Sequence, residues 1–309
     1  MAEENHRNPS DAIPNLTELV IREVFINFGL KQTGPVANLL SSIMYRPARE
    51  FAKVLSSIDH DASTSGLHGA ASNVLHHFVT RLEIRGWESP KEGPLLVVSN
   101  HPGGTDPFVL ASAIDRRDLH FLSQEHIVFD TLPNLKRFLV CTAEDRSDGH
   151  LAIRRIMSLL KKQQTVLIYP GGELELDPSI FQGTNELLRD WSQSVALILS
   201  RMPDVIVQPV VLRGTISMKA WKSWLTRIGK EVTTRLQIAM ITQIAIRQLK
   251  QDAYPVETTL IKGMPLRARD LSSDLNPDDI HRAVMDTVHG MLRADPLQFP
   301  FLEEIIPAT

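Results

Sequence analysis

From residue 82 onward, short and mostly apolar runs alternate with segments whose apolar residues recur at helical spacing. The runs predict buried strands, because a strand covered on both faces loses the alternation of apolar and polar positions. They lie at residues 82–85, 95–98, 119–122, 139–142, 166–169 and 205–212. Helices are predicted between several of them, at residues 107–114, 150–163 and 185–202. This alternation predicts an α/β fold with a largely parallel central sheet covered by helices.

The end of the chain extends the same pattern. A last strand is predicted at residues 258–261, and a closing helix at residues 277–292 has Asn276 as its N-cap. Residues 235–250 fit two structures, either one long helix or a strand within residues 236–241.

The residues before the first strand have a helical pattern. Residues 1–14 are polar and predict a disordered tail. Four helices are predicted after it, at residues 16–28, 36–45, 47–58 and 67–80, with Pro47 in the first turn of the third and a turn at residues 63–66 before the fourth. We therefore expect a helical N-terminal region, residues 15–80, followed by an α/β domain, residues 81–309.

Composition narrows the classes of protein that fit this pattern. The chain has 309 residues, enough for one large domain with a helical attachment, and its formal net charge of −3 argues against nucleic acid as the main partner. A single cysteine, Cys141, excludes an internal disulfide and suits a reducing compartment. The sequence has no apolar run typical of a signal peptide or a membrane span. We expect a cytoplasmic protein, either free or peripheral on the inner face of a membrane.

The stretch from Ser99 to Pro107 places a histidine and an aspartate in a glycine-bearing turn between a buried strand and a helix. Ligands of open α/β sheets bind at such strand ends. If the turn brings His101 and Asp106 together, the carboxylate orients the imidazole and strengthens it as a base toward an alcohol or amine. Asp106 followed by proline is equally a good helix start, with aspartate as the N-cap. Spacing alone favours neither interpretation, and both can hold.

Two further loops follow predicted strands. Tyr169-Pro170-Gly171-Gly172-Glu173 has glycines that let the backbone approach a ligand and present amides to an anion or a carbonyl oxygen. A loop without any binding function can have the same residues. Arg146 lies in a charged stretch after residue 142 and has the two-pronged geometry that binds a carboxylate or phosphate. A solvated turn is the simpler interpretation of that stretch by itself.

Together these motifs resemble the glycerolipid (lysophospholipid) acyltransferase family. Residues 100–106 are similar to its first motif, Asn-His and four residues to Asp, and Arg146 stands where its second motif ends in arginine. Residues 169–172 resemble its third motif, Phe-Pro-Glu-Gly-Thr-Arg, and residues 207–210 its fourth, an apolar strand interrupted by proline. Lys262-Gly263-Met264-Pro265-Leu266 is similar to a Gly-x-Pro turn near the end of such domains. The likeness covers about residues 82–292, and four motifs in the same order are more specific than any one.

The resemblance implies a glycerol-3-phosphate acyltransferase-like fold and a role in phospholipid biosynthesis. A fatty acyl group would pass from acyl-CoA or acyl-carrier protein to a hydroxyl of a glycerolipid or lysophospholipid, with His101 as general base and Asp106 orienting it. Neither a metal nor a bound cofactor is implied. The expected substrate-binding residues are Asn100, Gly103, Gly104, Thr105, Arg146, Gly171, Gly172, Glu173 and, beyond the fourth motif, Arg213.

The third motif departs from the family pattern. Gly171 stands in place of its glutamate, Glu173 in place of its threonine and Leu174 in place of its arginine, so residues expected to hold a phosphate-bearing acceptor are partly absent. Two alternatives follow: an acyltransferase for a non-phosphate acceptor, or an inactive acyl- or lipid-binding protein of the same fold. A third is a metal-assisted hydrolase that uses His101, Asp106 and an acidic loop, comprising Glu173, Glu175 and Asp177 with His126.

The N-terminal helices have two possible partners. Their apolar residues within 15–60 can lie in a membrane interface, where Lys31, Arg46, Arg49 and Lys53 favour anionic lipid. An amphipathic stripe equally predicts a helical cap packed on the sheet domain.

Overall fold

The computed structural model describes residues 9–142, 149–181 and 191–307. Its strands are β1 (Arg81–Gly86), β2 (Leu95–Ser99), β3 (Leu119–Gln124), β4 (Leu139–Thr142), β5 (Thr165–Ile168), β6 (Ile206–Arg213), β7 (Glu257–Lys262), β8 (Leu266–Arg267) and β9 (Phe301–Ile305). They form one mixed sheet in the order β4-β3-β5-β2-β6-β7-β1-β9, with β8 beside β6. Neighbours from β4 to β6 are parallel, as are β7 and β1, whereas β6–β7 and β1–β9 are antiparallel. The predicted α/β class with a largely parallel sheet is confirmed.

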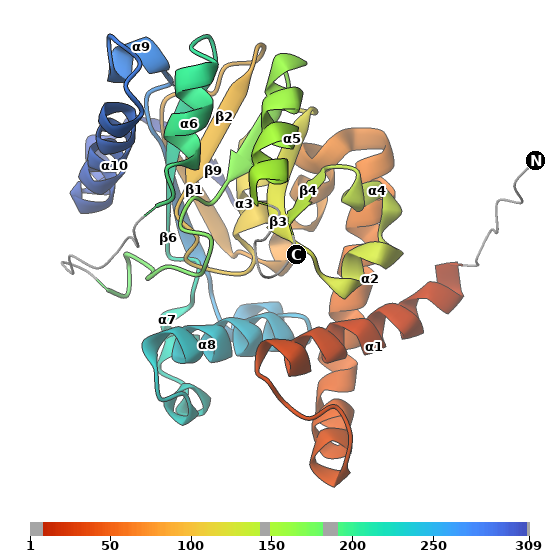
Figure 1. Cartoon of the computed structure of the whole chain (residues 1–309). Helices are drawn as coiled ribbons and strands as arrows, with labels where there is room; N and C mark the ends of the chain where they lie inside the picture. The colour runs from red at the N-terminus through yellow and green to blue at the C-terminus, as the bar shows by residue number, and fades with distance from the viewer. Residues whose placement is uncertain (1–8, 143–148, 182–190, 308–309) are drawn as a thin grey trace, which may run out of the picture.

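Helices cover both faces of the sheet (Figure 1). The longer ones after β2 are α3 (Asp106–Ala113), α5 (Gly149–Lys161), α6 (Ser194–Arg201), α8 (Val232–Arg247) and α10 (Pro277–Arg293). Short ones are α4 (Pro133–Lys136), α7 (Met218–Trp221), α9 (Ala268–Leu271), η1 (Leu75–His77), η2 (Ile127–Thr131), η3 (Trp224–Ile228), η4 (Gln251–Ala253) and η5 (Pro296–Gln298). Along β2, Leu95 and Val97 pack with the α2–α3 side, and Leu96 and Val98 with the α5–α6–α10 side. Burial on both faces explains why this strand is apolar throughout.

The N-terminal helices differ from the expected four. The structure has α1 (Pro9–Asn27) and one long α2 (Pro35–Val74), which is kinked at Gly66 with φ 69°. The predicted break at Pro47 is wrong, since this proline lies inside α2, and the predicted turn at residues 63–66 reduces to the Gly66 kink. A proline inside a helix is costly, and burial of Ala48, Ala52 and other residues of α2 against the core offsets that cost.

The predicted tail is also partly wrong. Residues 9–14 belong to α1, because the helix begins at Pro9, and only residues 1–8 lie outside the described range. In the part of the chain that the structure describes, no helix is long and apolar enough to cross a membrane.

Two elements toward the C-terminus could be assigned only from the structure. Residues 235–250 resolve into α8, whose buried positions Leu236, Ala239, Gln243 and Arg247 recur at helical spacing. The edge strand β9 was not predicted, because its exposed positions interrupt the apolar pattern. The predicted N-cap is confirmed: Asn276 Oδ1 accepts hydrogen bonds from the backbone N–H groups of Asp278 (2.9 Å) and Asp279 (3.4 Å). The predicted helix at 185–202 begins outside the described residues, and α6 lies within its second half.

Candidate active site

The turn between β2 and α3 brings the predicted histidine and aspartate together. His101 Nδ1 lies 3.0 Å from Asp106 Oδ2, and the Gly103 backbone N–H donates to the same oxygen at 2.7 Å. The Asp106 side chain is fully buried, whereas that of His101 is 22% exposed. Asp106 is the first residue of α3 and Thr105 is the N-cap, so the expectation that Asp106 caps the helix is wrong. Its carboxylate orients the imidazole instead.

The two glycines serve close packing in this turn. A Cβ on Gly103 would lie 2.8 Å from Thr215 Oγ1, and one on Gly104 would lie 2.5 Å from Met240 Sδ of α8. Neither glycine has a positive φ, so unusual backbone angles are not the reason for them. Thr215, after β6, approaches Gly103 closely, and a Cβ on Gly104 would require the Met240 side chain of α8 to shift.

The two nitrogens of the His101 imidazole have different surroundings. The Tyr169 ring stacks on His101 with centroids 4.2 Å apart and an interplanar angle of 15°. Burial raises the pKa of Asp106, while its hydrogen bonds to His101 and Gly103 act in the opposite direction. Burial also raises the pKa of the Tyr169 phenol. With Nδ1 held by Asp106 and one ring face covered by Tyr169, Nε2 is the remaining nitrogen for proton transfer.

Asn100 joins the turn between β2 and α3 to the neighbouring strand β6. Its Oδ1 accepts from the Leu212 N–H at 2.8 Å, and its Nδ2 donates to the Leu212 carbonyl at 3.0 Å. The side chain is fully buried. Asn100 is expected to bind substrate. In the structure its side-chain amide instead pairs with the Leu212 backbone and so positions the neighbouring His101.

Glu175 is a site residue that sequence reasoning assigned only to an acidic loop. Its Oε2 accepts from the His101 backbone N–H at 2.9 Å, and its own N–H donates to the His101 carbonyl at 2.8 Å. Its Oε1 accepts from Trp191 Nε1 at 2.9 Å. Glu175 is 2% exposed, a burial that its sequence position between Glu173 and Asp177 does not predict.

The remainder of the third motif forms a turn beside Glu175. The Gly172 N–H donates to the Tyr169 carbonyl at 3.0 Å, and Gly172 adopts φ 69°, which favours glycine. Gly172 and Glu173 are exposed. Their expected contact with substrate stays a prediction.

Asp177 holds the loop after β6 through three backbone N–H groups. Its carboxylate accepts from the backbone N–H groups of Gly214 (2.9 Å), Thr215 (2.8 Å) and Ile216 (3.2 Å). His126, grouped with these acids in the metal interpretation, contacts Glu23 of α1 instead, with Nδ1 3.4 Å from Oε2. Among the described residues, no group of three or more His, Cys, Asp or Glu side chains could hold a metal ion.

The two expected arginines have different outcomes. Arg146 lies outside the described residues. Arg213 donates to the carbonyls of Leu292 (2.6 Å) and Ala294 (3.2 Å) at the C-terminal end of α10, and burial lowers its pKa. Its guanidinium therefore serves as a helix C-cap in this structure, and its expected contact with an acceptor stays a prediction.

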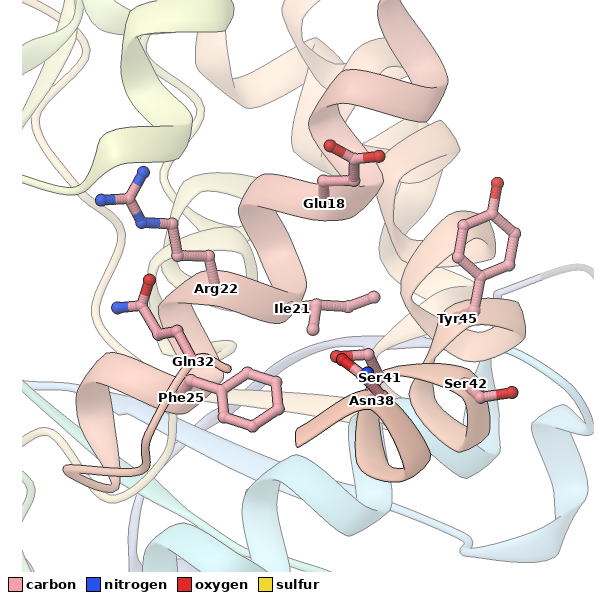
Figure 2. A pocket seen from close by; sticks show the side chains of 9 residues that line it. All are labelled: Glu18, Ile21, Arg22, Phe25, Gln32, Asn38, Ser41, Ser42 and Tyr45. Atoms are coloured by element: carbon pink, nitrogen blue, oxygen red, sulfur yellow. The ribbon is translucent and has the colours of Figure 1, made fainter. Parts of the chain in front are cut away.

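A separate cavity of about 610 Å³ lies between α1 and the first half of α2 (Figure 2). Ile21 and Phe25 supply apolar surface on the α1 side, and Asn38, Ser41 and Ser42 face them from α2. The N-terminal helices thus border an open pocket of mixed polarity, remote in sequence from His101 and Asp106.

Comparison with known proteins gives a family match and a similar solved structure. Residues 81–213 match the model of the Acyltransferase family, a range that runs from β1 to β6 and includes the turn with His101 and Asp106. No curated protein matches the chain. A similar solved structure is the 1-acyl-sn-glycerophosphate (LPA) acyltransferase PlsC from Thermotoga maritima, with 14% identity, 92% of each chain covered and a TM-score of 0.46. The matched residues 81–213 contain the first, third and fourth of the motifs that resemble the glycerolipid acyltransferase family.

Proposed function

We propose that this protein transfers a fatty acyl group from acyl-CoA or acyl-carrier protein to a hydroxyl of a glycerolipid or lysophospholipid acceptor. The observation that carries the proposal is the His101–Asp106 pair, 3.0 Å apart in the turn after β2 within the range that matches the Acyltransferase family. No bound metal or cofactor takes part in the proposed reaction.

The pair supports a general-base mechanism. His101 Nε2 takes the proton of the acceptor hydroxyl while the acceptor oxygen attacks the thioester carbonyl carbon. Asp106 accepts from Nδ1–H and stabilises the imidazolium that forms. Collapse of the tetrahedral intermediate breaks the carbon–sulfur bond, and the imidazolium returns its proton to the departing thiolate. Backbone amides at the glycine turns are candidates for the oxyanion site.

The arginine contacts favour a non-phosphate acceptor as the second candidate. Leu174 stands where the family has an arginine, and Arg213 is bound to the end of α10. A neutral or uncharged lipid hydroxyl needs neither side chain. The altered third motif also supports the hypothesis that the protein binds acyl chains without catalysing transfer.

The lipid acceptor suggests peripheral contact with a membrane through residues 15–60. In this stretch Val36, Leu39 and Ile43 are each more than 60% exposed along one side of α2. Their spacing of three and four residues places them on one helix face, as in helices that lie in a lipid interface. We place the protein in the cytoplasm, at the inner face of a membrane.

Acyl transfer by the purified protein and its His101→Ala variant tests the proposal. Labelled acyl-CoA is mixed with glycerol-3-phosphate, lysophosphatidate, a lysophospholipid or diacylglycerol, and acylated product is measured by mass spectrometry. We expect one acceptor to be acylated and the variant to lose roughly 10²–10⁴-fold in rate while keeping its unfolding transition. Unchanged activity in the variant contradicts the mechanism. Tight acyl-CoA binding without product identifies a binding protein, and release of free fatty acid that stops on chelation identifies the metal-assisted hydrolase.

A further inference from the structure

Ten of the exposed large apolar side chains of the described residues lie in two stretches, and three more, Leu297, Phe301 and Ile306, lie near residue 300. Of the two stretches, one lies at the N-terminal helices, and the other follows β6, through α7, η3 and the start of α8. The second stretch contains Met218 (43% exposed), Trp224 (70%), Ile228 (66%) and Val232 (42%). Isolated exposed apolar residues are ordinary, but several within one short segment mark an interaction surface.

The same segment has a cationic charge that opposes the charge of the whole chain. Between residues 218 and 235 the only acid is Glu231. The basic residues there are Lys219, Lys222, Arg227, Lys230 and Arg235, and all but Arg235 are exposed. The chain overall has a formal net charge of −3, so this excess of positive charge is local. We expect the partner of this segment to present both negative charge and apolar surface.

The exposed apolar side chains of this segment stand on a layer of packed and hydrogen-bonded residues. The Thr226 hydroxyl donates to the Trp221 carbonyl at 2.9 Å, and the Arg235 guanidinium lies 4.6 Å from the centroid of the Trp221 ring. Beneath them Ile216, Ala220, Leu236 and Ala239 form a buried cluster. The exposure of Trp224 and Ile228 is therefore a property of an ordered turn.

This segment is directly connected to the catalytic turn. Met240 of α8 contacts Gly104, and Gln243 of α8 accepts from the Ser217 N–H at 2.6 Å and donates to the Thr215 carbonyl at 2.9 Å. Val232 and Met240 are eight residues apart on one helix, which is about 12 Å along its axis. A surface that receives Val232 therefore lies within a lipid's reach of His101.

We propose that residues 218–235 dock on an anionic lipid bilayer and thereby place the catalytic turn at the membrane surface, where a lipid acceptor resides. The proposal rests on the proposed function for the nature of the acceptor. Trp224 and Ile228 enter the interfacial region, and the lysines and Arg227 face the anionic headgroups. Figure 1 shows α7, α8 and the turn between α1 and α2 on the same side of the sheet, so one plane can contact both stretches.

Vesicle flotation of the full chain tests this surface without any turnover. The probes are vesicles of phosphatidylcholine alone and of phosphatidylcholine with 30% phosphatidylglycerol. We expect binding to the anionic vesicles, and a roughly tenfold or greater loss of partitioning in Trp224→Ala/Ile228→Ala and in Lys222→Glu/Lys230→Glu. The matched control, Leu297→Ala/Ile306→Ala, removes apolar side chains of similar exposure elsewhere and should bind as the wild type does.

Each other outcome overturns the proposal. Equal binding of all variants excludes this surface, and equal binding to both vesicle types excludes an anionic partner. If Trp224→Ala/Ile228→Ala instead abolishes a dimer seen by light scattering without vesicles, the surface joins two copies of the chain. Because flotation measures binding alone, its failure is distinguishable from a failure of acyl transfer.

Discussion

Gly171 and the Glu175 carboxylate lie so close together beside His101 that a side chain at residue 171 would contact Glu175. A Cβ on Gly171 would lie 2.8 Å from Glu175 Oε1, so the carboxylate can occupy its place only because residue 171 has no side chain. The position where the acyltransferase motif has a glutamate is thus a glycine here, and a glutamate four residues later contacts the His101 backbone. This exchange links the unusual third motif to the placement of His101.

Gly171→Ala should displace the Glu175 carboxylate from His101. The added Cβ meets the far end of a side chain, so the expected cost is about 1–3 kcal/mol of unfolding free energy together with a slower acyl transfer. Urea unfolding and the transfer rate measure both effects. Gly290→Ala is the control, because a Cβ there meets nothing within 4 Å inside α10, and it should stabilise by about 0.5–1 kcal/mol.

Glu175→Gln should lower kcat more than it raises KM. The carboxylate accepts from both His101 N–H and Trp191 Nε1–H, and an amide must turn its NH₂ group toward one of these donors. We expect a loss of about 1.5–3 kcal/mol in stability.

The Trp191→Phe substitution provides the rescue of this variant. In the Glu175→Gln background it removes the opposing donor, so the amide oxygen can accept from His101 N–H, and part of kcat should return. In the wild-type background the same substitution only destabilises the core. Equal effects in the two backgrounds would show that Glu175 has a purely structural role.

Asp106→Asn should reduce kcat by about 10³–10⁴-fold with the fold intact. An amide keeps the shape of the side chain, and its oxygen can still accept from both His101 Nδ1–H and the Gly103 N–H, but it lacks the negative charge that stabilises the imidazolium formed on proton transfer. Stopped-flow or steady-state transfer assays measure the loss, and circular dichroism checks the fold. Tyr169→Phe is the companion variant: it keeps the ring stacked on His101 and should retain activity. An Asp106→Asn enzyme of wild-type activity would refute the role of the pair.

His77 should make the protein less stable in mild acid. Burial, with the nearby His76 and Arg247 charges, lowers the pKa of His77 from 6.5 to about 4. As pH falls from about 6.5 to 4, the unfolded chain binds a proton that the folded chain does not, so stability falls over this window. The half-buried position limits the effect to about 1–2 kcal/mol. Urea unfolding at pH 7 and pH 4.5 should show a smaller pH dependence in His77→Gln than in the exposed control His60→Gln.

Much of the fold follows from local patterns. Strands β2 and β5 were predictable because each is buried on both faces and is therefore almost wholly apolar. The closing helix was predictable because Asn276 and Pro277 are local signals for a helix start. Such signals depend on neighbours along the chain, which a sequence displays directly.

Other elements depend on contacts that the sequence does not display. Pro47 predicts a helix start, yet α2 continues through it because its other residues are buried against the core. The edge strand β9 has exposed residues, so it is recognisable only by its pairing with β1.

The sequence by itself determined that His101 and Asp106 stand in a turn after a buried strand, and that acyl transfer is the chemistry to expect there. Only the tertiary structure decided what surrounds them. Glu175 reaches His101 across 74 residues, and Asn100 reaches Leu212 across 112. These are hydrogen bonds between polar groups brought together by sheet pairing, and their sequence separation leaves no periodic trace. Short-range sequence patterns therefore predicted His101 as the candidate base, and long-range packing determined which residues position it.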